Sequence, residues 1–110
     1  MTSATTTGQP AKTASQTEVR HEPDCARYTI WQDGQTVGLA DYRVTPHEVR
    51  FIHTEVDPTR RGQGLAGRLV EFALDDVHVR TDLRVVADCP FVATWIGEHA
   101  EYEDLLTRGL

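Results

Sequence analysis

The residues best suited to chemistry lie in two short segments of the chain. Cys89 directly precedes Pro90, an arrangement typical of a helix N-cap, where unpaired N–H groups lower the pKa of a thiol and favour the thiolate nucleophile. His53 lies in an apolar run, and an imidazole can accept a proton near neutral pH. Glu55 shares the face of His53 in an extended strand, so it could orient the imidazole or act as a base itself.

Each of these residues also has a purely structural interpretation. Cys89 could be a small side chain that packs at the end of a strand. His53 could be a hydrogen-bonded structural histidine, and Glu55 could be a solvated rim residue. The residue types alone leave both interpretations open.

A glycine-rich segment follows, with the sequence Arg61-Gly62-Gln63-Gly64-Leu65-Ala66-Gly67. Glycines let the backbone approach a ligand and turn successive N–H groups toward one point, and a helix N-terminus adds partial positive charge. Together with Arg61, these features predict a cradle for a diphosphate. Two other interpretations are a dinucleotide-binding fingerprint, Gly62-x-Gly64-x-x-Gly67 with Asp88 at the end of the next strand, and an ordinary strand-to-helix turn.

The elements that position these residues follow from periodicity. Strand-like runs at 19–21, 26–32, 36–43 and 49–56, with a turn at Asp33-Gly34, predict an antiparallel meander. Within 49–56, alternation places Phe51, His53 and Glu55 on one face, and Ile52, Thr54 and Val56 on the other. Helical spacing then predicts a helix of about fifteen residues from Leu65. The run 83–87 predicts a strand covered on both faces, 90–99 a second helix, and 102–106 a final helical turn. Because a meander cannot form half of a doubly wound parallel sheet, the dinucleotide interpretation fits poorly.

Composition narrows the class of protein. The chain has 110 residues, enough for one domain, and 17 acidic against 11 basic residues give a net charge of −6. This balance argues against general binding to nucleic acid or to an anionic membrane. Cys25 and Cys89 form no disulfide framework and no metal-binding motif, and no apolar run approaches the ~20 residues of a membrane helix. Residues 1–17 predict a disordered tail without a secretory signal, and 18–110 the domain. We therefore expect a cytoplasmic protein without metal, as a monomer or weak dimer.

The segment Arg61–Ala66 resembles the diphosphate loop of GNAT-superfamily acetyltransferases, usually written [Q/R]-x-x-G-x-[G/A]. With His53-Thr54-Glu55-Val56, Cys89-Pro90-Phe91-Val92-Ala93 and Glu101-Tyr102, the chain resembles the small stand-alone GNAT-like N-acetyltransferase family over 19–106. That family usually has proline where this chain has Ala100, which should affect only a helix end. The resemblance implies a minimal GNAT-like acyl-CoA N-acyltransferase fold of the α/β (α+β) class, with a mixed, mostly antiparallel sheet and two main helices.

The resemblance also implies an acetyl-CoA-dependent N-acetyltransferase and a site for coenzyme A between 49–56 and 83–87. Cys89 and His53 would be the catalytic pair, with Glu55 as a further candidate, either in direct transfer to an amine or through acetylated Cys89. The residues implied to contact acetyl-CoA are Thr54, Val56, Arg61, Gly62, Gln63, Gly64, Leu65, Ala66, Cys89 and Phe91.

The acceptor side is expected to be shallow. Standard GNAT domains carry one or two helices between their first two strands, whereas only Pro23-Asp24-Cys25 separates them here. An open face suits a bulky acceptor, such as a protein N-terminus or a lysine side chain. It also suits the alternative function, a module that binds CoA or acyl-CoA without catalysis.

Overall fold

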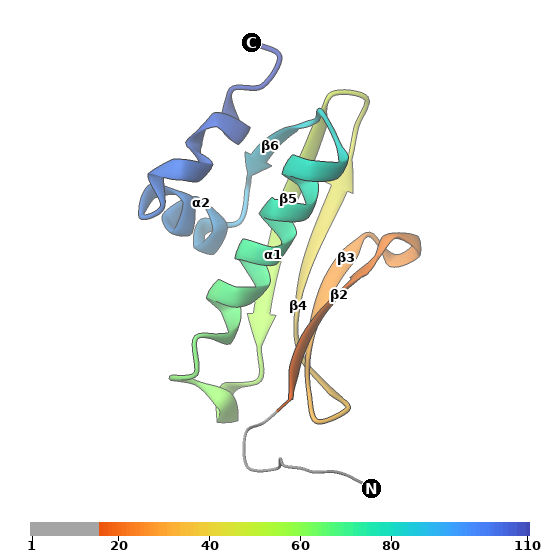
Figure 1. Ribbon diagram of the computed structural model, residues 1–110, viewed down its shortest axis with the longest axis vertical. Coiled ribbons are helices and arrows are strands. Elements are labelled where there is room, and N and C mark those ends of the chain that lie inside the picture. Colours follow the sequence, from red (N-terminus) through yellow and green to blue (C-terminus); the bar gives the residue numbers. More distant parts are fainter. Residues whose placement is uncertain (1–15) are drawn as a thin grey trace, which may run out of the picture.

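The computed structural model describes residues 16–110, which form a five-stranded sheet in the order β2-β3-β4-β5-β6 with helices packed against it (Figure 1). All neighbouring strands are antiparallel except β5 and β6, which confirms the mixed, mostly antiparallel sheet. The strands are β2 (Thr17–Glu22), β3 (Arg27–Gln32), β4 (Gln35–Val44), β5 (Glu48–Val56) and β6 (Arg84–Ala87). The helices are α1 (Leu65–Arg80) and α2 (Pro90–Gly97), with short 3₁₀ segments η2 (Pro23–Cys25), η3 (Pro58–Arg60) and η4 (Ala100–Leu106).

The predicted tail, 1–17, falls almost entirely outside the described residues. Strand β2 begins at Thr17, one residue before the expected start of the domain. The backbone N–H of Gln16 donates to Asp33 Oδ1 at 3.0 Å, so the ordered contacts of the chain reach at least to Gln16.

The hairpin between β3 and β4 is confirmed as a two-residue turn. Gln32 pairs with Gln35, and both intervening residues have positive φ, 50° at Asp33 and 84° at Gly34. Tight hairpins whose twist matches the sheet require this conformation, which Asp-Gly adopts readily. The turn brings the end of β3 to the same end of the sheet as the glycine-rich segment (Figure 1).

Strand β5 contains a bulge that the alternation pattern did not predict. Asp41 of β4 pairs with His53, but the next residue, Tyr42, pairs with Phe51, so Ile52 is an extra residue. A bulge shifts the alternation by one position. The prediction that Phe51, His53 and Glu55 share a face is therefore wrong: Phe51 is buried, whereas His53 and Glu55 are exposed on the opposite face.

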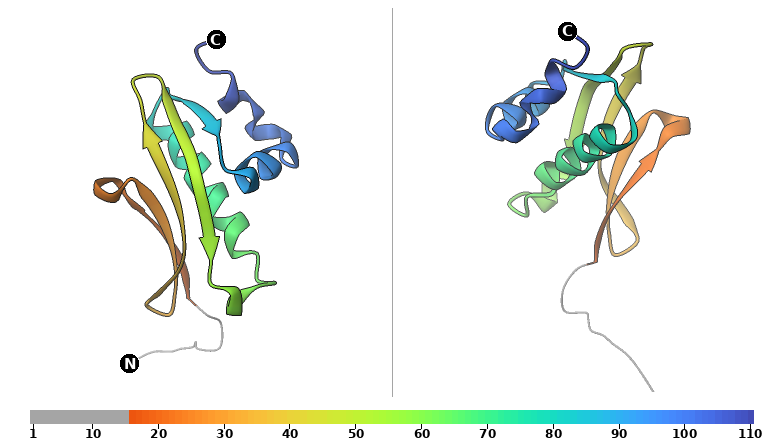
Figure 2. Two further views of the ribbon diagram at one scale, coloured as in Figure 1. Left: turned by 180° about the vertical axis from the view of Figure 1, so that it is seen from behind. Right: turned by 45° about the horizontal axis from the view of Figure 1, so that its top comes forward.

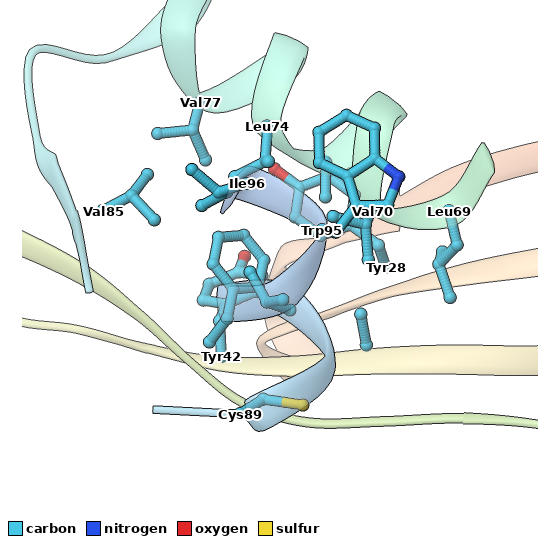
Figure 3. Close-up of a cluster of buried hydrophobic side chains, with 14 of the residues drawn as sticks. Tyr28, Tyr42, Leu69, Val70, Leu74, Val77, Val85, Cys89, Trp95 and Ile96 are labelled. Atoms are coloured by element: carbon cyan, nitrogen blue, oxygen red, sulfur yellow. The ribbon is translucent and has the colours of Figure 1, made fainter. Parts of the chain in front are cut away.

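The core lies between the sheet and the two helices (Figure 3). Helix α1 buries one apolar face, and α2 adds Val92, Trp95 and Ile96. A Cβ atom at Gly67 would lie 3.4 Å from Trp95 Nε1, so this glycine allows the indole to pack closely on α1. The apolar face of α1 consists of Leu65, Leu69, Val70, Ala73, Leu74 and Val77.

Strand β6 is apolar, but it is not covered on both faces as predicted. Only Val85 is buried, and Val86 and Ala87 are partly exposed. The strand is at the edge of the sheet, and the helices cover only the face that Val85 occupies.

Candidate active site

Strands β5 and β6 separate where the predicted catalytic residues lie. They pair from Glu48 with Arg84 to Phe51 with Ala87, and the last link is the Cys89 N–H, which donates to the Phe51 carbonyl at 2.9 Å. Beyond this point the chain enters α2, and β5 continues toward the glycine-rich loop without a strand on that side (Figure 2). The free edge of β5 beyond Phe51 can therefore pair with an extended ligand.

The glycine-rich loop at the end of this path has the geometry of an anion site. Gly62 has φ 84°, and Gly64, the N-cap of α1, has φ 70°. The first helical hydrogen bond runs from the Arg68 N–H to the Gly64 carbonyl, which leaves the N–H groups of the first helical turn without helical partners. A Cβ atom built at Gly62 or Gly64 meets nothing within 4 Å, so the space over the loop is open.

The side chains around the loop divide into ligand-facing and structural groups. Arg61 is exposed and forms no hydrogen bond or ion pair with residues 16–110, so its guanidinium is available to an anion. Leu65 is buried in the core, so only its backbone can contact a ligand. A diphosphate fits this combination of open space, N–H groups and one positive charge.

Cys89 lies at the N-cap of α2, as predicted, and is only 6% exposed. Its Sγ is 3.6 Å from Thr54 Oγ1 of β5. Burial raises the pKa of the Cys89 thiol, but the backbone N–H groups of Val92 and Phe91 and the Thr54 hydroxyl outweigh it, and the net pKa lies below its ordinary value. The helix end and Thr54 therefore make the Cys89 thiol more acidic than an ordinary cysteine.

His53 and Glu55 lie on the uncovered face of the sheet. Their side chains are 55% and 63% exposed, and His53 Nε2 is 2.7 Å from Glu55 Oε1. Asp41 is directly opposite His53 on β4. The pair can accept a proton from a group that approaches this open face.

The sequence comparison agrees with this geometry. Residues 27–105 match the model of the family described as GCN5-related N-acetyl-transferase. The chain belongs to this family of N-acetyltransferases. A search of curated proteins found no match.

Solved structures show the same fold for this GNAT chain. The ribosomal-protein-S18-alanine N-acetyltransferase of Escherichia coli superposes with a TM-score of 0.57 at 19% identity, over 66% of this chain and 50% of that one. The ribosomal-protein-alanine N-acetyltransferase of Brucella melitensis biovar Abortus 2308 superposes with a TM-score of 0.53 at 22% identity, over 71% of this chain and 58% of that one. This GNAT chain therefore aligns with about half the length of these enzymes.

The candidate site of this GNAT chain has the two predicted catalytic residues on different sides of β5. Thr54 points toward Cys89 on the helix side, whereas its neighbour His53 points to the uncovered face and bonds Glu55. No hydrogen bond joins His53 and Cys89. The fold thus brings together Cys89 with Thr54, and His53 with Glu55, but not the thiol with the imidazole.

The remaining residues predicted to contact acetyl-CoA lie between Cys89 and the glycine-rich loop. Val56 packs against the core at the end of β5, and Phe91 is exposed beside Cys89. Ala66 is partly buried in the first turn of α1, and Gln63 accepts a hydrogen bond from buried Gln32 at 2.7 Å.

The sequence interpretation missed Gln32 and Arg60 as neighbours of this loop. Gln32 shares the face of Tyr28 and Ile30 in alternation, and a polar residue at such an inward position was the available signal.

Within residues 16–110, no helix has the length and apolarity that crossing a membrane requires, and no group of three metal-binding side chains occurs.

Proposed function

We propose that this GNAT chain transfers the acetyl group of acetyl-CoA to an amine. The observation that carries the proposal is the continuous path from the open glycine loop, along the free edge of β5, to Cys89 and the strand that carries His53. A diphosphate at one end and a reacting thioester at the other are the chemistry that such a path suits.

Different residues bind different parts of acetyl-CoA. The loop N–H groups and Arg61 hold the diphosphate, and the backbone of β5 at Thr54 and Val56 pairs with the amide-containing arm. Phe91, exposed beside Cys89, contacts the end that carries the sulfur. Acetyl-CoA supplies an activated acetyl group when bound.

The acceptor approaches the uncovered face of the sheet, and His53 removes its proton. The amine nitrogen forms the new bond to the acetyl carbon, the carbon–sulfur bond to CoA breaks, and the amine proton passes to the His53–Glu55 pair. Direct transfer is favoured over transfer through Cys89 because the imidazole that would activate the thiol lies on the other side of β5. The Cys89 thiol lies beside this edge of β5, and in its protonated form it can donate its S–H proton to the departing CoA sulfur.

The acceptor we propose is a protein amine, an N-terminus or a lysine. The connection between β2 and β3 is a single 3₁₀ turn, so no helix of residues 16–110 covers the sheet face at His53. The two similar solved structures are enzymes named for a ribosomal-protein alanine, which is consistent with a protein N-terminus. A flat face accepts an extended peptide more readily than it encloses a small molecule.

Mass spectrometry tests the proposal. The protein is incubated with acetyl-CoA and a mixture of peptides, and examined under native and denaturing conditions beside Cys89→Ala and His53→Gln. We expect a CoA-mass complex in all three proteins, acetylated peptides with wild type, and strongly reduced peptide acetylation with His53→Gln. An acetyl adduct on wild type that Cys89→Ala lacks would instead favour transfer through the thiol.

Two outcomes would count against the proposal as a whole. Absence of any CoA-mass species would remove acetyl-CoA as the ligand. A stable CoA complex without acetylation of any peptide or small amine would favour the non-catalytic binding module.

A further inference from the structure

Gln32 is an unusual buried residue at the end of β3. Its side chain is only 3% exposed, and Thr29 is the other buried polar side chain of residues 16–110. Burying an amide is costly unless its N–H and C=O groups are hydrogen-bonded. The partners of Gln32 therefore show what this buried amide holds in place.

Both short hydrogen bonds of the Gln32 amide reach the glycine loop. Its Nε2 donates to Gln63 Oε1 at 2.7 Å, and its Oε1 accepts from Arg60 Nη1 at 2.7 Å. The next contact, from Nε2 to Thr17 Oγ1, is longer at 3.5 Å. One buried amide thus ties the residues on both sides of Arg61-Gly62.

Arg60 fastens the same loop at two further points. Its Nη2 donates to Gln35 Oε1 at 3.3 Å, and its Nε lies 3.8 Å from Asp57 Oδ2. The Nε atom is buried and has no hydrogen-bond partner, so charge attraction to Asp57 is its nearest compensation. Arg60 is therefore a structural cation, unlike its neighbour Arg61.

These hydrogen bonds affect ligand binding because the loop contains two glycines. Gly62 and Gly64 adopt positive φ, and a glycine loses more backbone freedom on ordering than any other residue. A loop with two glycines would lose that freedom on binding a ligand unless the folded protein had already fixed it. Fixing a loop in its binding conformation increases affinity because less entropy is lost on binding.

We propose that Gln32, acting through Gln63 and Arg60, is a positioning residue that holds the glycine loop in its diphosphate-binding conformation. The identity of the ligand rests on the proposed function, whereas the ordering of the loop does not. The set Gln32, Gln63 and Arg60 is called the loop clasp below.

The test is a double-mutant cycle on CoA affinity. Calorimetry gives Kd for wild type, Gln32→Leu, Gln63→Leu and the double variant, and Thr29→Val is the matched control from the same strand. Thr29 is also buried, but its hydroxyl forms hydrogen bonds with Glu22 and Trp31 and with no residue of the glycine loop. Gln63 is exposed, so Gln63→Leu breaks the clasp even if Gln32→Leu folds poorly.

We expect Gln63→Leu to weaken CoA binding roughly three- to tenfold, as loss of one hydrogen bond would, and Gln32→Leu at least as much, because it removes the bonds to both Gln63 and Arg60. The double variant should bind no more weakly than Gln32→Leu, because that change already removes the bond that Gln63→Leu breaks. Thr29→Val should keep the wild-type Kd. An unchanged Kd in both single variants, or an equal loss in Thr29→Val, would overturn the proposal.

Backbone NMR relaxation separates this inference from the proposed function. The order parameters of the amides of residues 61–64 should be lower in Gln32→Leu and Gln63→Leu than in wild type or Thr29→Val. If wild type binds no CoA, the proposed function fails, and the order parameters still decide whether the clasp orders the loop. Equal order parameters in all four proteins would show that it does not.

Discussion

The Cys89 sulfur lies 3.6 Å from the Thr54 hydroxyl, on the side of β5 opposite the neighbouring His53. The bulge at Ile52 produces this arrangement, because it turns Thr54 inward and His53 outward. The end of α2 and Thr54 consequently lower the pKa of the thiol, whereas the contact partner of the imidazole is Glu55. The two groups that look like a catalytic pair in sequence have separate partners.

The first prediction concerns the acidity of Cys89. Thr54→Val removes a hydroxyl that stabilises the thiolate and should raise the pKa of the Cys89 thiol. The rate of alkylation by iodoacetamide against pH measures this, in a Cys25→Ser background because Cys25 is an exposed free thiol. His53→Gln should not change the dependence of the alkylation rate on pH. A larger shift with His53→Gln than with Thr54→Val would mean that the imidazole does control the thiol.

The second prediction concerns proton removal from the acceptor. His53→Gln should lower the rate of acetyl transfer at saturating acetyl-CoA about 100-fold or more, because it removes the proposed general base. Glu55→Gln should have a smaller effect in the same direction, since it weakens the 2.7 Å contact that holds the imidazole. Arg43→Gln, an exposed change on neighbouring β4, serves as the control. Full activity in His53→Gln together with none in Cys89→Ala would assign the transfer to the thiol.

Much of this fold could be predicted because its signals are local. Asp33-Gly34 defines a turn by backbone preference alone, and apolar spacing from Leu65 defines a helix. The glycine loop is also local, since its conformation depends on residues that lie next to one another. Each of these features was predicted at the right place.

The bulge and the clasp could not be predicted in the same way. Ile52 follows Phe51 in an apolar run, and neither residue type indicates that Ile52 forms a bulge and has no partner on β4. The bond from Gln32 to Gln63 joins residues 31 positions apart and exists only once the hairpin and the loop meet. Features that depend on register between strands, or on long-range contacts, need the assembled structure.

The third prediction separates backbone strain from ligand binding at the loop. Gly64 and Gly34 both have positive φ, and a Cβ atom at either meets nothing within 4 Å. Gly64→Glu and Gly34→Glu should each lower the free energy of unfolding by about 1–2 kcal/mol, the cost of placing an L-residue in this conformation. Only Gly64→Glu should abolish CoA binding, because its carboxylate would occupy and repel the diphosphate. Chemical denaturation and calorimetry measure the two effects, and loss of CoA binding in Gly34→Glu would contradict the location of the site.

The fourth prediction is a pH dependence of stability at the opposite end of the sheet. His21 stacks on Tyr28 at 4.3 Å, its Nε2 is 2.6 Å from Tyr42 Oη, and its Nδ1 is 2.9 Å from Arg80 Nη2 and 3.4 Å from Asp76. Burial lowers the pKa of His21, and Arg80 lowers it further against the opposing effect of Asp76. Neutral His21 accepts a hydrogen bond from Arg80 through Nδ1. Protonation would place an N–H group at Nδ1 against the N–H group of Arg80 Nη2.

The sign of this effect follows from proton linkage. The unfolded chain takes up a proton at His21 near pH 6.5, whereas the folded chain resists until lower pH, so stability is full above about 6.5 and falls as the pH decreases below it. His21→Phe should flatten this part of the curve between about pH 5 and pH 7, while His47→Gln, an exposed histidine, should not. Urea denaturation at a series of pH values measures the difference. An equal slope in wild type and His21→Phe would mean that His21 titrates alike in both states, and that burial and the contact from Arg80 do not favour the neutral imidazole.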